Sequence, residues 1–371
     1  MSLSNTTTSR AATPRKTTPR KAGAAHPTAA YSELLSTVRD MGLLRKRRGF
    51  YYTMFGALVL ALAGAAAGFV LLGDTWYQLL IAAALGLIFT QFAFLAHEAS
   101  HRQVFESNKA NDRAGRVLAT AFVGMSYSWW MSKHTRHHGN PNMVGKDPDI
   151  AIDFVSFTPE DAATRKGAWA LLTRKQGWLL YPMLLLEGIN LHFLSLKTLV
   201  DPKPVEGRRF ELWMIGVRLV AYVAVIFAFL PLGMAFAFIG VQLAVFGLYM
   251  GASFAPNHVG MTIFPEGSRI DFLSKQVLSS RNIKGNWGMT IFMGGLDLQT
   301  EHHLFPNMPR PSLVKVRSIV REYCATHKIP YTETGFFEAH KQVIAYMNKV
   351  GLSAPDPFDC PLINQYRTRR A

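Results

Sequence analysis

Two long stretches without a charged side chain constrain the fold of this chain more than any other feature. They are Phe50–Leu72 and Trp76–Ala96, and only a short turn at Gly73-Asp74 separates them. An apolar segment of this length can cross the hydrocarbon core of a bilayer as an α-helix, which satisfies its own backbone hydrogen bonds. The pair therefore predicts a tight transmembrane helical hairpin.

A second hairpin is predicted further along the sequence. Its spans are Leu212–Leu230 and Gly233–Ala255, joined at Pro231-Leu232. Hydrophobic residues make up 49% of the chain and charged residues only 17%, whereas soluble domains carry about 25% charged residues. The sequence therefore predicts an all-α integral membrane protein with four transmembrane helices in two hairpins.

Two other apolar segments are not predicted to span the membrane. Val117–Met131 is too short, and its aromatic residues favour an interfacial or re-entrant position. Trp178–Leu196 is long enough to span. However, Glu187, Asn190 and His192 interrupt it, and such side chains are costly on a lipid-facing helix. We expect this segment to be an amphipathic helix on the cytoplasmic face.

Basic residues set the predicted orientation. The turns inside both hairpins lack Lys and Arg, whereas basic residues flank the first hairpin on both sides: Arg45, Lys46, Arg47, Arg48, Arg102, Lys109, Arg113 and Arg116. The positive-inside rule then places both termini and the long segments 97–211 and 256–371 in the cytoplasm. Half of the net charge of +16 lies in the first fifty residues, and the remaining basic residues flank apolar spans. Membrane lipid is therefore an expected partner and nucleic acid is not.

The chain divides into three predicted parts. Residues 1–30 are rich in Ser, Thr, Pro, Lys and Arg and can bury little apolar surface, so we expect a disordered basic tail. Residues 31–325 are expected to form the membrane domain and residues 326–371 a C-terminal cytoplasmic tail. The two cysteines, Cys324 and Cys360, form no CxxC motif, which excludes a cysteine-based zinc site.

Eight of the twelve histidines form tight groups in the segments predicted to be cytoplasmic. His97 and His101 are four residues apart, which places both imidazoles on one face of a helix. In the second group, His137 and His138 follow His134 by three and four residues, so their imidazoles also lie on one face of a helix. The other grouped histidines are His134, His137, His138, His258, His302 and His303. Because the predicted topology brings all of them to one membrane edge, we expect them to converge on one metal site.

The number of imidazoles indicates two metal ions. Structural zinc takes four ligands, so eight are too many for one ion and fit two ions with room for water or dioxygen. Imidazole suits Zn, Cu, Fe and Ni. Zinc hydrolysis would also need a carboxylate base, and only Glu98 and Glu301 lie inside the groups. Redox-active iron is the better fit. His192 stands apart and is expected to be a hydrogen-bonded core histidine.

The histidine motifs HEASH (97–101), HTRHH (134–138) and QTEHHLFP (299–306), interleaved with two hairpins, resemble the histidine boxes of the integral-membrane fatty acyl desaturases. The resemblance extends from about residue 50 to residue 325. The QxxHH form of the third motif is similar to the branch that includes front-end and linoleoyl-CoA type enzymes and actinobacterial acyl desaturases.

This resemblance implies a four-helix membrane domain whose cytoplasmic helical cap holds a non-haem diiron centre. It implies eight iron ligands: His97, His101, His134, His137, His138, His258, His302 and His303. Members of the HxxHH kind have a histidine where this chain has Gln299, so the ninth ligand position departs from the pattern. The Gln299 amide would ligate directly or hold a metal-bound water, and Asn257 is a weaker candidate for contact through water.

The implied reaction is the O2-dependent insertion of a cis double bond into a long-chain acyl group carried by CoA or a lipid. The C–H bonds of CH2 groups are too strong for acid–base catalysis, so the cofactor performs the hard step. The protein would hold the acyl chain in a narrow apolar tunnel. Because the chain has no His-Pro-Gly-Gly haem motif, two electrons are expected from a separate donor, either a ferredoxin with a flavoprotein reductase or a free cytochrome b5.

A basic face is predicted to dock this acidic carrier or to hold the phosphates of CoA. Its residues are Arg281, Lys284, Arg310, Lys315, Arg317 and Arg321. Two alternative functions stay open at this point. A diiron lipid hydroxylase or ketolase would use the same oxidant, although the QxxHH motif favours desaturation. A histidine-rich metal transporter is less compatible, because the first two spans contain no charged residue.

Overall fold

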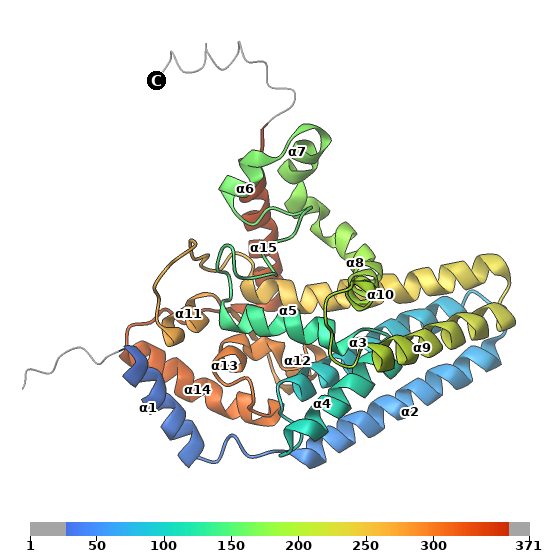
Figure 1. Ribbon diagram of the computed structural model, residues 1–371, viewed down its shortest axis with the longest axis horizontal. Coiled ribbons are helices and arrows are strands. Elements are labelled where there is room, and N and C mark those ends of the chain that lie inside the picture. The colour runs from blue at the N-terminus through green and yellow to red at the C-terminus, as the bar shows by residue number, and fades with distance from the viewer. Residues whose placement is uncertain (1–26, 356–371) are drawn as a thin grey trace, which may run out of the picture.

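The part of the chain that the structure describes, residues 27–355, folds mainly into helices (Figure 1). The structure is a computed structural model. Its α-helices are α1 Pro27–Asp40, α2 Arg48–Leu72, α3 Gln78–Ser100, α4 Asn108–Val117, α5 Tyr127–Gly139, α6 Pro159–Thr164, α7 Gly167–Arg174, α8 Gln176–Val200, α9 Arg208–Phe229, α10 Leu232–His258, α11 Phe272–Leu278, α12 Trp287–Phe292, α13 Gln299–Leu304, α14 Arg310–Thr326 and α15 Phe336–Gly351. A π-helical segment, η1 Leu118–Val123, follows α4, and a 3-10 helix, η2 Leu296–Leu298, precedes α13.

Five helices within residues 27–355 are long and apolar enough to cross a membrane: α2, α3, α8, α9 and α10. Four of them coincide with the predicted spans. The fifth, α8, covers the segment that we expected to lie on the cytoplasmic face, and it is the least apolar of the five. The protein is therefore a helical, integral-membrane type of structure, while the number of spans and the orientation of the termini stay predictions.

The first hairpin is closed by a local hydrogen-bonded turn. Helix α2 ends at Leu72 and is followed by Gly73, whose φ of 55° lies in the left-handed region that glycine adopts without a steric penalty. The buried side-chain amide of Gln78 then donates to the carbonyls of Phe69 and Gly73, at 2.7 and 2.8 Å. These bonds satisfy carbonyl groups that the end of α2 leaves open, so α3 returns directly alongside α2.

Helices α8 and α10 approach each other closely at two glycines. A Cβ atom on Gly188 would lie 2.2 Å from the carbonyl oxygen of Leu243, and one on Gly247 would lie 2.3 Å from the backbone nitrogen of Gly188. Small residues allow this kind of close backbone contact between apolar helices. The contact fixes α8, together with Glu187 on it, against the helix that ends at His258.

A buried carboxylate holds the segment that carries the second histidine group. Glu211 of α9 is fully buried and pairs with Arg116 of α4. It also accepts hydrogen bonds from the hydroxyls of Ser126 and Ser128, and Ser126 caps the start of α5. The apolar stretch 117–131, predicted to be interfacial or re-entrant, thus consists of η1, a break at Gly124 and the first turn of α5. Its position in the membrane stays a prediction.

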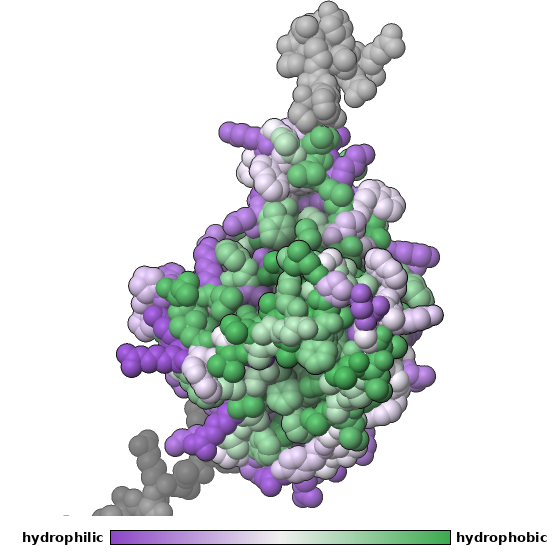
Figure 2. Space-filling model, turned by 90° about the vertical axis from the view of Figure 1, so that its right-hand side faces the viewer, coloured by the Kyte–Doolittle hydropathy of each residue, from purple (hydrophilic) through white to green (hydrophobic). Residues whose placement is uncertain are grey.

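Apolar side chains remain exposed on the long helices, as expected for surfaces that face lipid. Figure 2, which views the molecule from the hairpin turns, shows hydrophobic residues gathered over much of this face. Examples are Leu71 of α2 and Leu232 of α10, which are 85% and 66% exposed. The shorter helices α1, α11, α13 and α14 gather at the opposite end (Figure 1), where a helical cap was predicted.

The predicted terminal tails are only partly described. Residues 1–26 of the basic tail and residues 356–371, including Cys360, lie outside the described residues. Within residues 326–355, the strand β2 Glu333–Gly335 pairs in parallel with β1 Asn282–Lys284, and α15 packs against α8 and α10. This part of the C-terminal segment is therefore built into the fold, and the domain boundary at residue 325 stays a prediction.

Candidate metal centre

All eight grouped histidines lie at helix ends that meet in one place. His97 is in the last turn of α3, and His101 follows that helix directly. The C-terminal half of α5 carries the second group, the last turn of α13 carries the third, and α10 ends at His258. Because a helix end places the side chains of neighbouring turns on one face, four separate segments can direct imidazoles at a common point.

Five of these histidines form one group, which we call the five-histidine cluster: His97, His101, His134, His138 and His302. One ring nitrogen of each lies within 4.8 Å of the others. The Nε2 atom of His134 is 2.9 Å from that of His97 and 2.7 Å from that of His101. The Nε2 atoms of His138 and His302 are buried, with no hydrogen-bond partner among the described residues.

The other three form the three-histidine cluster: His137, His258 and His303. The Nε2 atoms of His137 and His258 are 3.3 Å apart, and that of His303 is buried without a partner in residues 27–355. The two clusters are in contact, because the rings of His138 and His303 stack with centroids 4.2 Å apart. The arrangement is a pair of adjacent nitrogen-lined sites.

The rings of the three-histidine cluster are held through their Nδ1 atoms. His137 Nδ1 is 3.0 Å from Asp147 and 3.3 Å from Asp149. His258 Nδ1 is 2.8 Å from the carbonyl oxygen of Ser279. His303 Nδ1 is 2.9 Å from Gln276 Oε1. Such partners orient a metal-binding imidazole and direct its Nε2 lone pair at the ion.

Sequence reasoning did not single out these partners. The sequence signal for the first of them is the acidic pair of Asp147 and Asp149, which follows the second histidine group within a dozen residues. The acceptors at Gln276 and Ser279 carry no comparable signal.

Burial keeps most of these imidazoles neutral. It is the main cause that lowers the pKa of His134, His138, His302 and His303 well below the usual value, and it lowers the pKa of His101 to about 3. Burial also acts on His137, but Asp149 and Asp147 outweigh it and raise its pKa. A metal ion binds the neutral imidazole, so the histidines whose pKa is lowered are in the form that metal binding requires.

The two amide residues lie beside the three-histidine cluster. The Nε2 atom of Gln299 is 2.8 Å from His258 Nε2, and its Oε1 atom accepts a hydrogen bond of 3.3 Å from Asn257 Nδ2. Asn257 also donates to the carbonyl of Ser253, at 2.9 Å. Both residues are buried. Gln299 therefore contacts a histidine of the cluster directly, whereas Asn257 contacts Gln299.

A buried ion pair lies behind the five-histidine cluster. Arg310 of α14 donates to Glu98 through Nε and Nη2, at 2.8 and 2.6 Å. Tyr51 of α2 completes the arrangement, because its hydroxyl lies 3.4 Å from Glu98 and 3.0 Å from Gln103. Glu98 thus points away from the metal ligands and joins the end of α3 to the start of α14.

The prediction of an exposed basic face is wrong for two of its residues, Arg281 and Arg310, because both are buried. Arg310 is fully buried in the ion pair with Glu98. Arg281 is 2% exposed, and its guanidinium donates to the carbonyls of Pro256 and Val259 at the end of α10. Both guanidinium groups satisfy buried acceptors rather than facing solvent. His192 is in neither cluster, since its ring bonds to the carbonyls of Gly188 and Val123, as expected of a core histidine.

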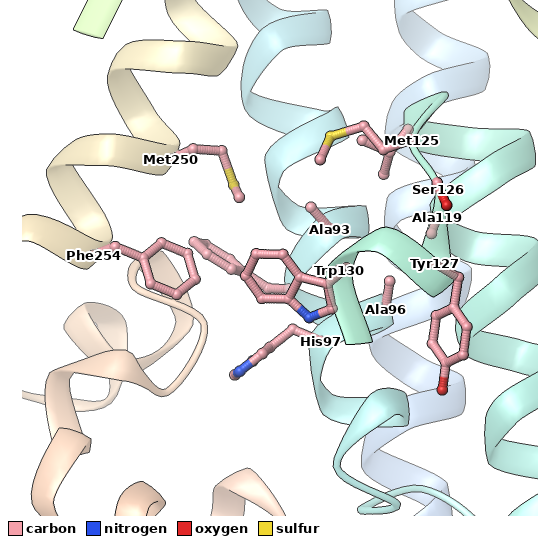
Figure 3. Close-up of a pocket in the computed structure, with 12 residues that line it drawn as sticks. Ala93, Ala96, His97, Ala119, Met125, Ser126, Tyr127, Trp130, Met250 and Phe254 are labelled. Atoms are coloured by element: carbon pink, nitrogen blue, oxygen red, sulfur yellow. The ribbon is translucent and has the colours of Figure 1, made fainter. Parts of the chain in front are cut away.

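Two mainly apolar cavities border the centre and share part of their lining. A small one, of about 30 Å³, borders His97 (Figure 3). A larger one, of about 220 Å³, borders His137 and His258. The two share the side chains of Trp130, Met250 and Phe254, which we call the divider. In Figure 3, the indole of Trp130 lies to the right of Phe254, with His97 beneath it. An apolar chain placed along both cavities would pass both histidine clusters.

The sequence matches the family described as fatty acid desaturase over residues 74–335. It is similar to the Delta(8)-fatty-acid desaturase of Borago officinalis, with 27% identity over 88% of this chain and 76% of that protein. It is also similar to the acyl-lipid (9-3)-desaturase of the same plant, with 26% identity over 88% of this chain and 75% of that one. The Delta(6)-fatty-acid desaturase fat-3 of Caenorhabditis elegans is 28% identical over 84% and 72%.

Proposed function

The chain belongs to the fatty acid desaturase family, and we propose that it inserts a cis double bond into a long-chain acyl group at a centre of two iron ions. The observation that carries this proposal is the division of eight buried or half-buried histidines into two touching clusters. The proposed ligands are therefore those of the five-histidine and three-histidine clusters. Gln299 is proposed as a further ligand or as the holder of a bound water, with Asn257 behind it.

The donor set fits such a pair of ions. Neutral nitrogens converge within 4.8 Å in each cluster, and several have no hydrogen-bond partner among the described residues. An unpaired buried nitrogen costs free energy unless something else binds it. Imidazole ligands suit iron, and sites with fewer protein ligands keep positions open for water or dioxygen.

The chemistry requires two ions, O2 and an external donor. When bound, the iron ions would supply the oxidant that removes one hydrogen from each of two adjacent CH2 groups. Reduction of O2 to two waters takes four electrons, of which the substrate provides two. The other two must come from a separate donor, for which we propose a ferredoxin with a flavoprotein reductase or a free cytochrome b5. The basic residues left exposed for docking are Lys284, Lys315 and Arg321.

The protein's own contribution is to hold the acyl chain and to exclude water. The two cavities that share the divider are lined mainly by apolar side chains, so an acyl chain gains free energy by leaving water to enter them. The divider brings the chain close to His97 and His137, and a fixed position next to the metal selects which CH2 groups react. We propose an acyl-CoA or an acyl-lipid as the substrate and cytoplasmic termini.

Purification in detergent with metal analysis tests the proposal. We expect two iron ions per chain, O2 consumption that depends on a reductant and an acyl substrate, and a new double bond in the product. Expression in a host that lacks polyunsaturated lipids, followed by mass spectrometry, would locate that bond. A protein that bound only zinc and consumed no O2 with supplied donors and substrates would contradict the proposal.

A further inference from the structure

Three charged side chains line the larger cavity, whose other lining residues are mainly apolar. They are Lys133 of α5, Asp149 of the loop after α5, and Glu187 of α8, and we call them the charged trio. Lys133 and Asp149 line the cavity, and 30% and 36% of their side-chain surfaces are accessible. An acyl chain needs none of these charges, and charged groups in an apolar site persist only where they have a partner or a function.

The charged trio is connected directly to the metal centre. Lys133 Nζ is 2.7 Å from Asp149 Oδ1, and Asp149 Oδ2 is 3.3 Å from Nδ1 of His137. Lys133 and His137 are also four residues apart on α5, so they project from the same helical face. A group bound by Lys133 would therefore stand at a fixed distance from the metal held by His137.

The charged trio has hydrogen-bond donors and acceptors that its contacts within the described residues do not use. Among the described residues, the Lys133 ammonium has Asp149 as its acceptor, which leaves N–H groups directed elsewhere. Glu187 accepts one hydrogen bond of 3.0 Å, from Asn190. One positive group faces two carboxyl groups, so the trio offers no net positive charge to a free carboxylate. A neutral carbonyl oxygen matches the unused N–H donors.

We propose that Lys133 donates a hydrogen bond to the carbonyl oxygen of the ester or thioester that joins the acyl chain to its carrier. This inference rests on the proposed desaturase function and adds the binding site for the polar end of the substrate. The methyl end of the chain then runs past the divider toward the cavity beside His97 (Figure 3). The spacing between Lys133 and His137 sets which carbons lie at the metal.

The first test changes only the substrate. Wild-type holoenzyme is given an acyl-CoA thioester and the matching thioether, which lacks the carbonyl oxygen. A hydrogen bond to a charged donor contributes enough that the KM of the thioether should be about 10- to 100-fold higher. Equal KM values for the two compounds would overturn the inference. This test needs no variant and is unaffected by any folding defect.

The second test removes the donor. Lys133→Met keeps the length of the side chain and loses the ammonium group. We expect the thioester KM to rise about 10- to 100-fold and the thioether KM to stay unchanged, with products whose double bonds are spread over several positions. A structural defect would instead lower turnover of both compounds equally, and that result would also overturn the inference. Lys166→Met is the matched control, because Lys166 is exposed and lies outside the cavity.

The source of the carbonyl is decided by comparing carriers. A CoA thioester, a phospholipid ester and a free fatty acid are offered to wild-type protein and to Lys133→Met. The carrier whose KM rises in the variant is the one that Lys133 binds, and a free acid should be used poorly by both proteins. Preference for the free acid that disappears in the variant would refute recognition of a neutral carbonyl. If wild-type protein holds iron and desaturates but treats thioester and thioether alike, only this inference fails.

Discussion

The two histidine clusters are built from the same side chain but are supported in different ways. In the five-histidine cluster the rings contact mainly one another, and Nδ1 of His97 and of His138 has no partner in residues 27–355. In the three-histidine cluster every ring is held from outside, by carboxylates, a backbone carbonyl or an amide. The larger cavity and the charged trio border the three-histidine cluster only.

This difference indicates a division of roles. Five imidazoles can enclose an ion, whereas three leave coordination positions open, and open positions are typical of catalytic metals. The outer hydrogen bonds of the three-histidine cluster would compensate for its smaller number of ligands by fixing the rings in place. We therefore expect the ion in the three-histidine cluster to be held less tightly and to depend on its outer partners.

The largest effect should come from removing one imidazole from each cluster. His137→Ala leaves two histidines in the smaller cluster, so we expect iron to fall from two ions to one and turnover to be lost. His134→Ala leaves four imidazoles in the larger cluster, as many as a structural zinc site uses, so both ions should remain. Iron content after dialysis measures the difference. Equal iron loss in both variants would contradict a difference in metal binding between the two clusters. His340→Ala is the control, because His340 lies outside both clusters.

The next largest effect concerns the ion pair behind the five-histidine cluster. Arg310→Leu leaves the buried Glu98 carboxylate without its partner, and breaking a buried pair in this way destabilises a protein by about 3–5 kcal/mol. We expect a clear fall in Tm in detergent. The double change with Glu98→Leu should recover part of it, because no unpaired charge then remains.

The control for that experiment is Lys341→Leu. Lys341 and Glu338 form an exposed pair in which the side chains are 76% and 58% accessible, and such pairs contribute little. A Tm fall for Lys341→Leu as large as that for Arg310→Leu would show that burial of the ion pair is not what supports the cluster.

The contacts that hold the histidine clusters in place were not predicted from the sequence, whereas the helices and the grouping of the histidines were. The four helices of the two hairpins follow from long, mainly apolar runs, which are local properties of the sequence. The grouping of the histidines follows from helical spacing together with the predicted topology. The pairing of Glu98 with Arg310 joins residues more than two hundred positions apart, and nothing local in the sequence indicates it. The same reason made Arg310 and Arg281 look like members of a surface patch.

Helix α8 and Arg218 show a related difficulty. Polar residues in an apolar segment weaken the prediction of a span, yet α8 is as long as α2 and buries Gly188 against α10. Arg218 lies within a predicted span, where its guanidinium lies over the rings of Phe89 and Tyr222. Composition reveals such polar groups but not all the partners that make them tolerable, because some, such as Phe89 of α3, come from other helices.

A smaller effect is expected from the outer partners of the three-histidine cluster. Asp147→Asn removes the charge beside His137 while keeping the size of the side chain. Outer partners of this kind contribute about 10- to 100-fold to metal affinity, so iron should leave the smaller cluster faster in the presence of a chelator. Asp153→Asn, at an exposed loop position, is the matched control. If release from both clusters accelerates equally, the outer bonds do not distinguish them.

The smallest effect should come from Gln299→His, which adds a fourth imidazole to the three-histidine cluster. Position 299 precedes His302 and His303 by three and four residues on α13, so the new ring would share their face. Gln299 already lies 2.8 Å from His258 Nε2. We expect iron to be held up to about tenfold more tightly, and turnover to fall a few-fold because an open coordination position is then occupied.

Gln299→Leu separates the two possible contributions of the amide. Leucine has a similar volume and cannot bind a metal or a water molecule. If the amide helps to hold the ion, this variant should lose iron faster than wild-type protein, and Gln299→His should lose it more slowly. If all three proteins release iron at one rate, the amide only fills space beside Asn257. The smaller cluster would then keep its open positions for O2 without any help from residue 299, and its weaker hold on iron would come from the number of imidazoles alone.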